Sequence, residues 1–140
     1  MKSFPFRLLP HFAALAVMVC PSPCLSATKA DFAGKWKAEF QKTTFCKLDV
    51  ETGDTINGTI SVGDIHTDED GNLQDVTAAE KEHPLQEARV EEGALLFDWT
   101  DDDGEVSHLE FTLVSKTEGR LRFVDGPAAF HLKPFQMKKQ

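Results

Sequence analysis

The chain has 140 residues, with 23 acidic and 15 basic side chains and a formal net charge of −8. A surface of that sign repels nucleic-acid phosphates and anionic lipid headgroups, so the composition argues against a nucleic-acid-binding protein. The length fits one domain that is large enough to bury a hydrophobic core.

Residues 1–27 have the three parts of a secretory signal peptide. Lys2 and Arg7 give a positive start, an apolar run follows from Leu8 to Val19, and Leu25-Ser26-Ala27 offers a cleavage site after Ala27. The apolar run is shorter than the roughly 20 residues that span a bilayer. We therefore expect a signal helix that is cleaved, a secreted or periplasmic protein, and no stable membrane insertion after cleavage. A retained anchor and a lipidated cysteine are the alternatives.

The predicted mature domain, residues 28–140, keeps Cys46 as its single cysteine. It therefore forms no internal disulfide, and its stability has to come from packing. Cys46 is predicted to be a buried, inert strand thiol, with a reactive or dimer-forming thiol as the alternative. Because Lys2 and Arg7 leave with the signal, the mature domain is more acidic than the whole chain.

Alternating apolar and polar residues predict strands in the first half of the domain. The segments 34–41 and 44–51 come first, and a turn at 52–54 leads into 55–62, which alternates without a break through Asn57-Gly58. The segment 64–86 is less regular. It contains an acidic turn at 68–72, either a helical turn or a short strand within 75–82, and a break at Pro84.

The second half is predicted to be a meander of short strands. Strands are expected at 88–91, 95–99, 109–113 and 121–123, with turns at Glu92-Gly93, 101–104 and 117–119 and a last strand that includes Phe130, Leu132, Phe135 and Met137. The fold class is all-β, an antiparallel up-and-down meander of about eight strands. A barrel is favoured over a sandwich because closure hides the strand edges.

The sequence Phe32-Ala33-Gly34-Lys35-Trp36-Lys37 opens the first strand. It resembles the opening motif of the calycin group, the lipocalins and fatty-acid-binding proteins. The resemblance implies that Trp36 closes one end of a barrel and packs against a late arginine, either Arg120 or Arg122, with Arg122 preferred. The match covers this one motif, and the Thr-Asp-Tyr motif and helices of those families are absent from the sequence. A secreted bacterial β-domain of similar shape is the alternative.

The sequence contains no recognisable catalytic or metal-binding motif. The segment Gly58–Gly63 has the wrong spacing for a nucleophile elbow, and there is no phosphate-binding glycine loop and no His-Glu-x-x-His. The histidines lack zinc-ligand spacing, and the turns beginning at Asp68 and Asp101 lack the first acid of a calcium loop. We expect no catalytic residue, metal or cofactor, and a hydrolase is the least supported hypothesis.

The inward-facing aromatic residues suggest what the domain does. Five of them are predicted to bind ligand: Trp36, Phe97, Trp99, Phe111 and Phe123. Since an eight-stranded barrel is either filled by side chains or holds one ligand, the main hypothesis is an exported, non-catalytic barrel that binds a small apolar ligand. The alternative is a secreted interaction module that binds an envelope protein through its acidic surface and holds no interior ligand.

Overall fold

A computed structural model describes residues 27–126 and 132–140. The predicted signal peptide lies, apart from Ala27, outside the described residues, and so does Phe130 of the predicted last strand. The elements in chain order are α1 (Lys29–Phe32), β1 (Gly34–Phe40), β2 (Thr43–Thr52), β3 (Ile56–Val62), β4 (Ile65–Thr67), β5 (Leu73–Val76), β6 (Glu82–Pro84), β7 (Gln86–Glu91), β8 (Ala94–Thr100), β9 (Val106–Leu113), β10 (Glu118–Asp125) and β11 (Phe135–Lys139).

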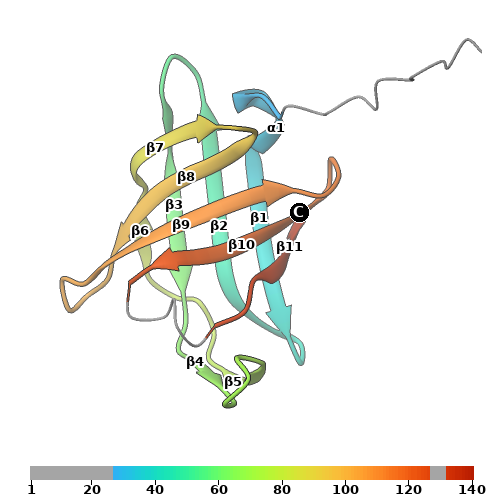
Figure 1. The fold of residues 1–140 in the computed structure, drawn as a ribbon, viewed down its shortest axis with the longest axis vertical. Helices are drawn as coiled ribbons and strands as arrows, with labels where there is room; N and C mark the ends of the chain where they lie inside the picture. Colours follow the sequence, from blue (N-terminus) through green and yellow to red (C-terminus); the bar gives the residue numbers. More distant parts are fainter. Residues whose placement is uncertain (1–26, 127–131) are drawn as a thin grey trace, which may run out of the picture.

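The main sheet is an antiparallel, nearly closed barrel. Within the described residues it has nine strands, in the order β6-β3-β2-β1-β11-β10-β9-β8-β7 (Figure 1). Most neighbouring strands follow one another along the chain. The exceptions are β3, which pairs with β6, and the first strand, β1, which pairs with the last, β11. The structure therefore confirms the predicted all-β, up-and-down meander and the choice of a barrel.

The second closure of the barrel is made by the short segment that contains β6 and β7. β6 pairs with β3, where His83 lies opposite Ile60, whereas β7 pairs with β8. Leu85 alone separates the two strands, and its N–H donates to the carbonyl oxygen of Gly58 at 3.0 Å. β6 and β7 thus act as one bent strand that bridges β3 to β8. The break predicted at Pro84 is only this one-residue bend.

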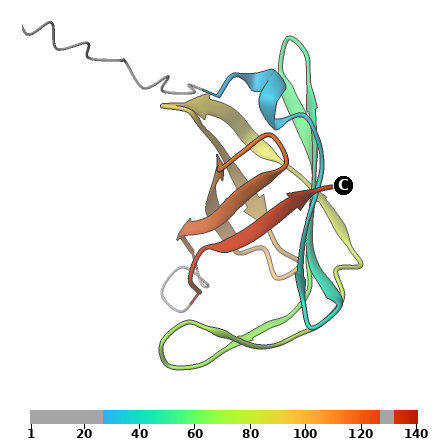
Figure 2. The same cartoon turned by 90° about the vertical axis from the view of Figure 1, so that its right-hand side faces the viewer.

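The irregular segment between β3 and β6 contains a separate hairpin. β4 and β5 pair with each other, with Ile65 opposite Val76, and form no ladder with the main sheet. Figure 2 shows this hairpin extending beyond the barrel at the end opposite α1. Residues 77–81 have no regular secondary structure, so the helical turn that the sequence left open for 75–82 is wrong.

The helix α1 has four residues and covers the other end of the barrel (Figure 2). Asp31 accepts a hydrogen bond from the backbone N–H of Thr28 at 2.8 Å, which fixes the start of the helix. Phe32, its last residue, is completely buried. Within the described part of the chain, no helix is sufficiently long and apolar to cross a membrane.

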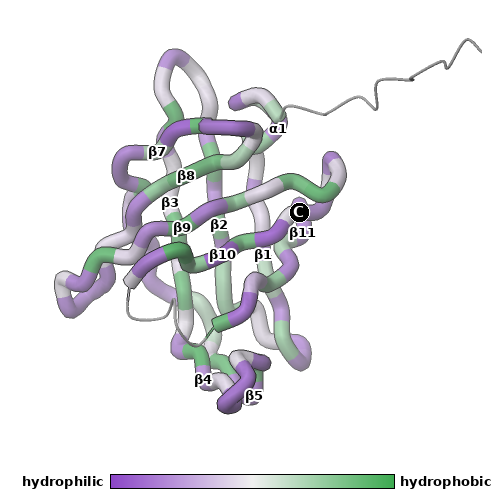
Figure 3. Tube along the Cα trace, in the orientation of Figure 1, coloured by the Kyte–Doolittle hydropathy of each residue, from purple (hydrophilic) through white to green (hydrophobic). Residues whose placement is uncertain are grey.

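The barrel interior is apolar because the strands alternate. β10 buries Leu121 and Phe123 and exposes Arg122 between them. Figure 3 shows apolar and polar residues alternating along other strands as well. One exception is a β-bulge between β1 and β2, which shifts the register after Ala38. It turns the consecutive residues Phe45 and Cys46 of β2 into the core, where each is at most 1% exposed.

The buried state of Cys46 leads to a simple prediction. Burial raises the pKa of this thiol, and the thiolate is the reactive form. We expect Cys46 in the native protein to resist an aromatic disulfide reagent at about pH 8 and to react fully once the protein is denatured. Fast labelling of the native protein, followed by absorbance, would contradict the position of Cys46 in the core.

Candidate functional site

The five residues predicted to bind ligand divide between the two ends of the barrel. Trp36 and Phe111 lie together at the α1 end, with ring centroids 5.0 Å apart. Trp99 and Phe123 form a second contact, at 6.2 Å, near the opposite end. Phe97 is buried on β8, and all of these residues except Trp99 are at most 4% exposed. The structure therefore does not bring the predicted set together in one place.

The α1 end is filled by protein side chains. Trp36 Nε1 donates a hydrogen bond to the Phe32 carbonyl oxygen at 2.9 Å. The rings of Phe32 and Trp36 both pack on Phe111, at centroid distances of 5.9 and 5.0 Å. A Cβ on Gly119 would lie 2.4 Å from the Phe111 ring, so glycine is required beside it. All three aromatic rings are fully buried, and the single indole donor is satisfied inside the protein.

The cation beside Trp36 is Lys139, which corrects the predicted stacking of a late arginine. Lys139 is the register partner of Trp36, and its Nζ lies 5.4 Å from the centre of the indole ring. Arg122 donates instead to Glu110 at 3.1 Å, and Arg120 is exposed. Both arginines occupy outward positions of β10, since the apolar residues between and after them fill the inward positions. Strand alternation therefore keeps them out of the barrel.

The opposite end contains two ring nitrogens that are buried and have no hydrogen-bond partner among the described residues. They are Nε1 of Trp99 and Nδ1 of His83, on rings that meet edge to face with centroids 6.0 Å apart. His83 reaches this position because β6 pairs with β3 and places it opposite the inward-facing Ile60. An unpaired buried polar group costs about 1–3 kcal/mol. A bound molecule that pairs these atoms would recover part of that cost.

The other ring nitrogen of His83 contacts a carboxylate outside the barrel. Its Nε2 lies 3.1 Å from Oδ1 of Asp102, and Lys81 Nζ lies 2.6 Å from the same oxygen. The hydrogen bond from Lys81, and then that from His83, lowers the pKa of Asp102, so this carboxylate is charged and accepts hydrogen bonds. When Nε2–H donates to Asp102, Nδ1 of a neutral imidazole is an acceptor. In that tautomer of His83, the barrel end offers one donor, Nε1–H of Trp99, and one acceptor, Nδ1 of His83.

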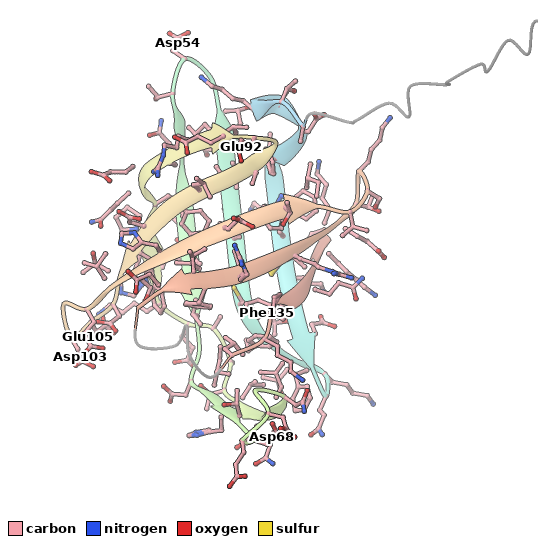
Figure 4. All side chains as sticks on the ribbon, viewed as in Figure 1. Asp54, Asp68, Glu92, Asp103, Glu105 and Phe135 are labelled. Atoms are coloured by element: carbon pink, nitrogen blue, oxygen red, sulfur yellow. The ribbon has the colours of Figure 1, made fainter. Side chains whose placement is uncertain are left out.

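Aromatic contacts continue from Trp99 across this end of the barrel. Phe123 lies 6.5 Å from Phe135, and Phe135 lies 5.0 Å from Phe45, as ring centroids. Figure 4 shows Phe135 near the β4–β5 hairpin. Two predicted ligand-binding residues, Trp99 and Phe123, thus share a site with His83. The sequence analysis missed His83 because a three-residue strand has no period-two pattern that would reveal its inward side.

Ser61, His83 and Asp102 are of the residue types that serve as nucleophile, base and acid in hydrolases, but the structure places Ser61 apart from His83. Ser61 lies opposite Glu82, whereas His83 lies one position further along β6, so the side chains of Ser61 and His83 point to opposite faces of the sheet. Ser61 Oγ is buried and lacks a hydrogen-bond partner in the described part of the chain. Ser61 and His83 therefore do not form a catalytic pair with Asp102.

The two predicted acidic turns use their carboxylates to hold the turn itself. Oδ1 of Asp68 accepts the backbone N–H groups of Asp70 and Asn72 at 2.9 and 2.8 Å. Oδ1 of Asp101 accepts two backbone N–H groups in the same way, both at 2.9 Å. Across residues 27–126 and 132–140, no group of three or more His, Cys, Asp or Glu side chains is arranged to hold a metal ion.

Next to Trp99, an ion pair on the outer face predicts a pH dependence. Nδ1 of His108 pairs with Oδ1 of Asp98 across β8 and β9, and this hydrogen bond, helped by the Asp98 charge, raises the pKa of His108. The pair therefore stabilises the fold below the pKa of an unfolded histidine, about 6.5, and this contribution is lost as the pH rises through the folded pKa. As the pH rises from about 5.5 to about 8.5, we expect the urea concentration at the unfolding midpoint to fall further in wild type than in His108→Gln. Equal changes in the two proteins would contradict the assignment.

Comparison with known proteins identifies no matching protein-family model. It likewise finds no matching curated protein and no matching solved structure. What the chain binds is therefore inferred from its own side chains and their contacts.

Proposed function

We propose that the chain is an exported, non-catalytic β-barrel that binds one small, largely apolar molecule at the barrel end opposite α1. The ligand carries a hydroxyl or amide group, which donates to Nδ1 of His83 and accepts from Nε1–H of Trp99. Its apolar body lies against Phe123 and the neighbouring aromatic rings. The protein is secreted or periplasmic, after cleavage of residues 1–27.

One observation carries the proposal: two neighbouring aromatic rings, with centroids 6.0 Å apart, each bury a polar nitrogen without a described partner. The same barrel supplies an internal comparison, because the other indole, Trp36, has its donor paired with the Phe32 carbonyl. Buried polar groups are nearly always paired in folded proteins. A ligand that supplies one acceptor and one donor would pair both atoms.

The second candidate function is the interaction module that acts through acidic surface. Figure 4 shows Asp54, Asp68, Asp103 and Glu105 at the tips of hairpin turns, pointing away from the barrel. Such carboxylates favour a partner with a basic surface, such as an envelope protein. Specific capture of such a partner, together with no uptake of small molecules, would support this function and exclude the first.

Replacing Trp99 with Phe tests the ligand site. The change keeps an aromatic ring but removes the unpaired donor, so we expect the affinity for 2-naphthol, measured by calorimetry, to fall roughly five- to tenfold. The affinity for naphthalene, which has the same body without the hydroxyl, is expected to stay the same.

The matched control is Trp36→Phe. It removes an indole N–H that is already paired within the protein, at the other end of the barrel, so it lowers stability but leaves the affinity for 2-naphthol within about twofold. The proposal is contradicted if wild type binds no 2-naphthol at millimolar concentration, or if both variants lose affinity equally.

Export gives a separate prediction. We expect the protein, expressed at full length in a Gram-negative bacterium, to be found in the periplasm with Thr28 as its first residue. Intact-mass measurement of the periplasmic fraction checks both points. A cytoplasmic protein that retains residues 1–27 would contradict the export part of the proposal.

A further inference from the structure

The seam between β1 and β11 is open along half of its length. The ladder pairs Trp36 with Lys139 and Lys37 with Lys138, and it ends there. Gln140 N–H still donates to the Lys35 carbonyl at one end of this ladder. At the other end, residues 38–40 of β1 pair only with β2, and the start of β11 pairs only with β10. A cleft of about 420 Å³ lies at this opening.

The floor of the cleft is apolar because of the β-bulge described above. The bulge turns Phe45 inward beside Cys46, and the Phe45 ring meets Phe135 edge to face at 5.0 Å. Leu73 of the β4–β5 hairpin adds a third apolar side chain to the lining. Leu73 is partly exposed, whereas Phe45 and Phe135 are 1% and 8% exposed, so the floor offers a small apolar surface to a ring or chain.

The rim of the cleft is cationic, although the protein is acidic. Lys37, Lys42 and Lys138 line it together with one carboxylate, Glu39. Lys37 pairs with Glu39 at 2.8 Å and lowers its pKa, so these two charges offset each other. Lys42 and Lys138 form no ion pair with any residue in the described ranges. The rim thus has a surplus of positive charge at these two lysines.

The backbone at Lys42 is itself unusual. Gln41 and Lys42 form the two-residue turn between β1 and β2, and both have positive φ, 48° and 68°. Asn and Gly adopt this turn most easily, and other residues do so at some cost. The chain therefore has a strained lysine at the rim in place of a residue that suits the turn.

We propose that the β1–β11 seam is a second binding site, which takes a small organic carboxylate with an apolar body. The carboxylate lies between Lys42 and Lys138, and the body lies on Phe45 and Phe135. The Phe135 ring contacts Phe123 of the site proposed at the Trp99 end, but the two sites differ in their polar groups: this one uses two lysine charges, and that one uses an uncharged hydrogen-bond pair.

The test uses 2-naphthoate as the probe and measures its binding to the full mature protein by calorimetry at low salt. The double variant Lys42→Gln/Lys138→Gln is expected to bind 2-naphthoate roughly fivefold more weakly than wild type. In about 0.5 M salt, this difference in affinity is expected to become smaller. The matched control is Lys35→Gln/Lys47→Gln, which removes two exposed strand lysines outside the cleft lining and should bind like wild type. Since all four lysines are on the surface, circular dichroism is expected to show an unchanged fold.

Three outcomes would overturn the proposal. They are no binding of 2-naphthoate to wild type at millimolar concentration, equal weakening in the two lysine pairs, and loss of 2-naphthoate binding in Trp99→Phe with no loss in Lys42→Gln/Lys138→Gln. The last outcome would place the carboxylate at the Trp99 end. Failure of 2-naphthol to bind, with 2-naphthoate behaving as expected, would remove the proposed function and leave the seam site intact.

Discussion

Closure of a single sheet is the constraint on which the rest of this structure depends. The sheet closes once where β1 meets β11 and once where the chain bends at Leu85 and bridges β3 to β8. Pairing of β6 with β3 places His83 opposite Ile60 and beside Trp99, where the two rings carry the buried nitrogens of the proposed ligand site. The β1–β11 ladder stops early and leaves the seam cleft. Both proposed sites thus arise where the barrel closes.

The two ends of the barrel differ in how their polar atoms are satisfied. At the α1 end, the Phe32-x-Gly34-x-Trp36 motif closes the barrel with contacts within and next to the motif. The indole N–H of Trp36 donates to the Phe32 carbonyl, and the rings of both residues pack on Phe111. The Lys139 side chain fills the space beside Gly34, where a Cβ would lie 2.7 Å from Lys139 Cε. At the other end, His83 and Trp99 each have one buried ring nitrogen without a partner in the described part of the chain. The indole donor is therefore paired within the protein at the α1 end, and the proposed ligand site lies at the other end.

Much of the fold is predictable from the sequence because alternation is a local signal. The pairs Leu121/Phe123 and Leu95/Phe97 give the inward faces of their strands directly, and the turn residues give the meander. Much of the site is not predictable, because it depends on register between distant segments. Lys139 reaches Trp36 through pairing of the first and last strands, and Phe45 turns inward through a bulge, so neither leaves a periodic trace in the sequence.

The central claim, that the end opposite α1 completes its hydrogen bonds with a bound molecule, is tested most directly by native mass spectrometry. The mature protein would be purified without detergent from its own host compartment, or incubated with the small-molecule extract of that host. The account predicts a mass excess of one small organic molecule that is lost on denaturation and has a lower occupancy in Trp99→Phe than in wild type. A bare mass under both conditions would contradict the claim and would mean that the barrel is filled and acts through its surface.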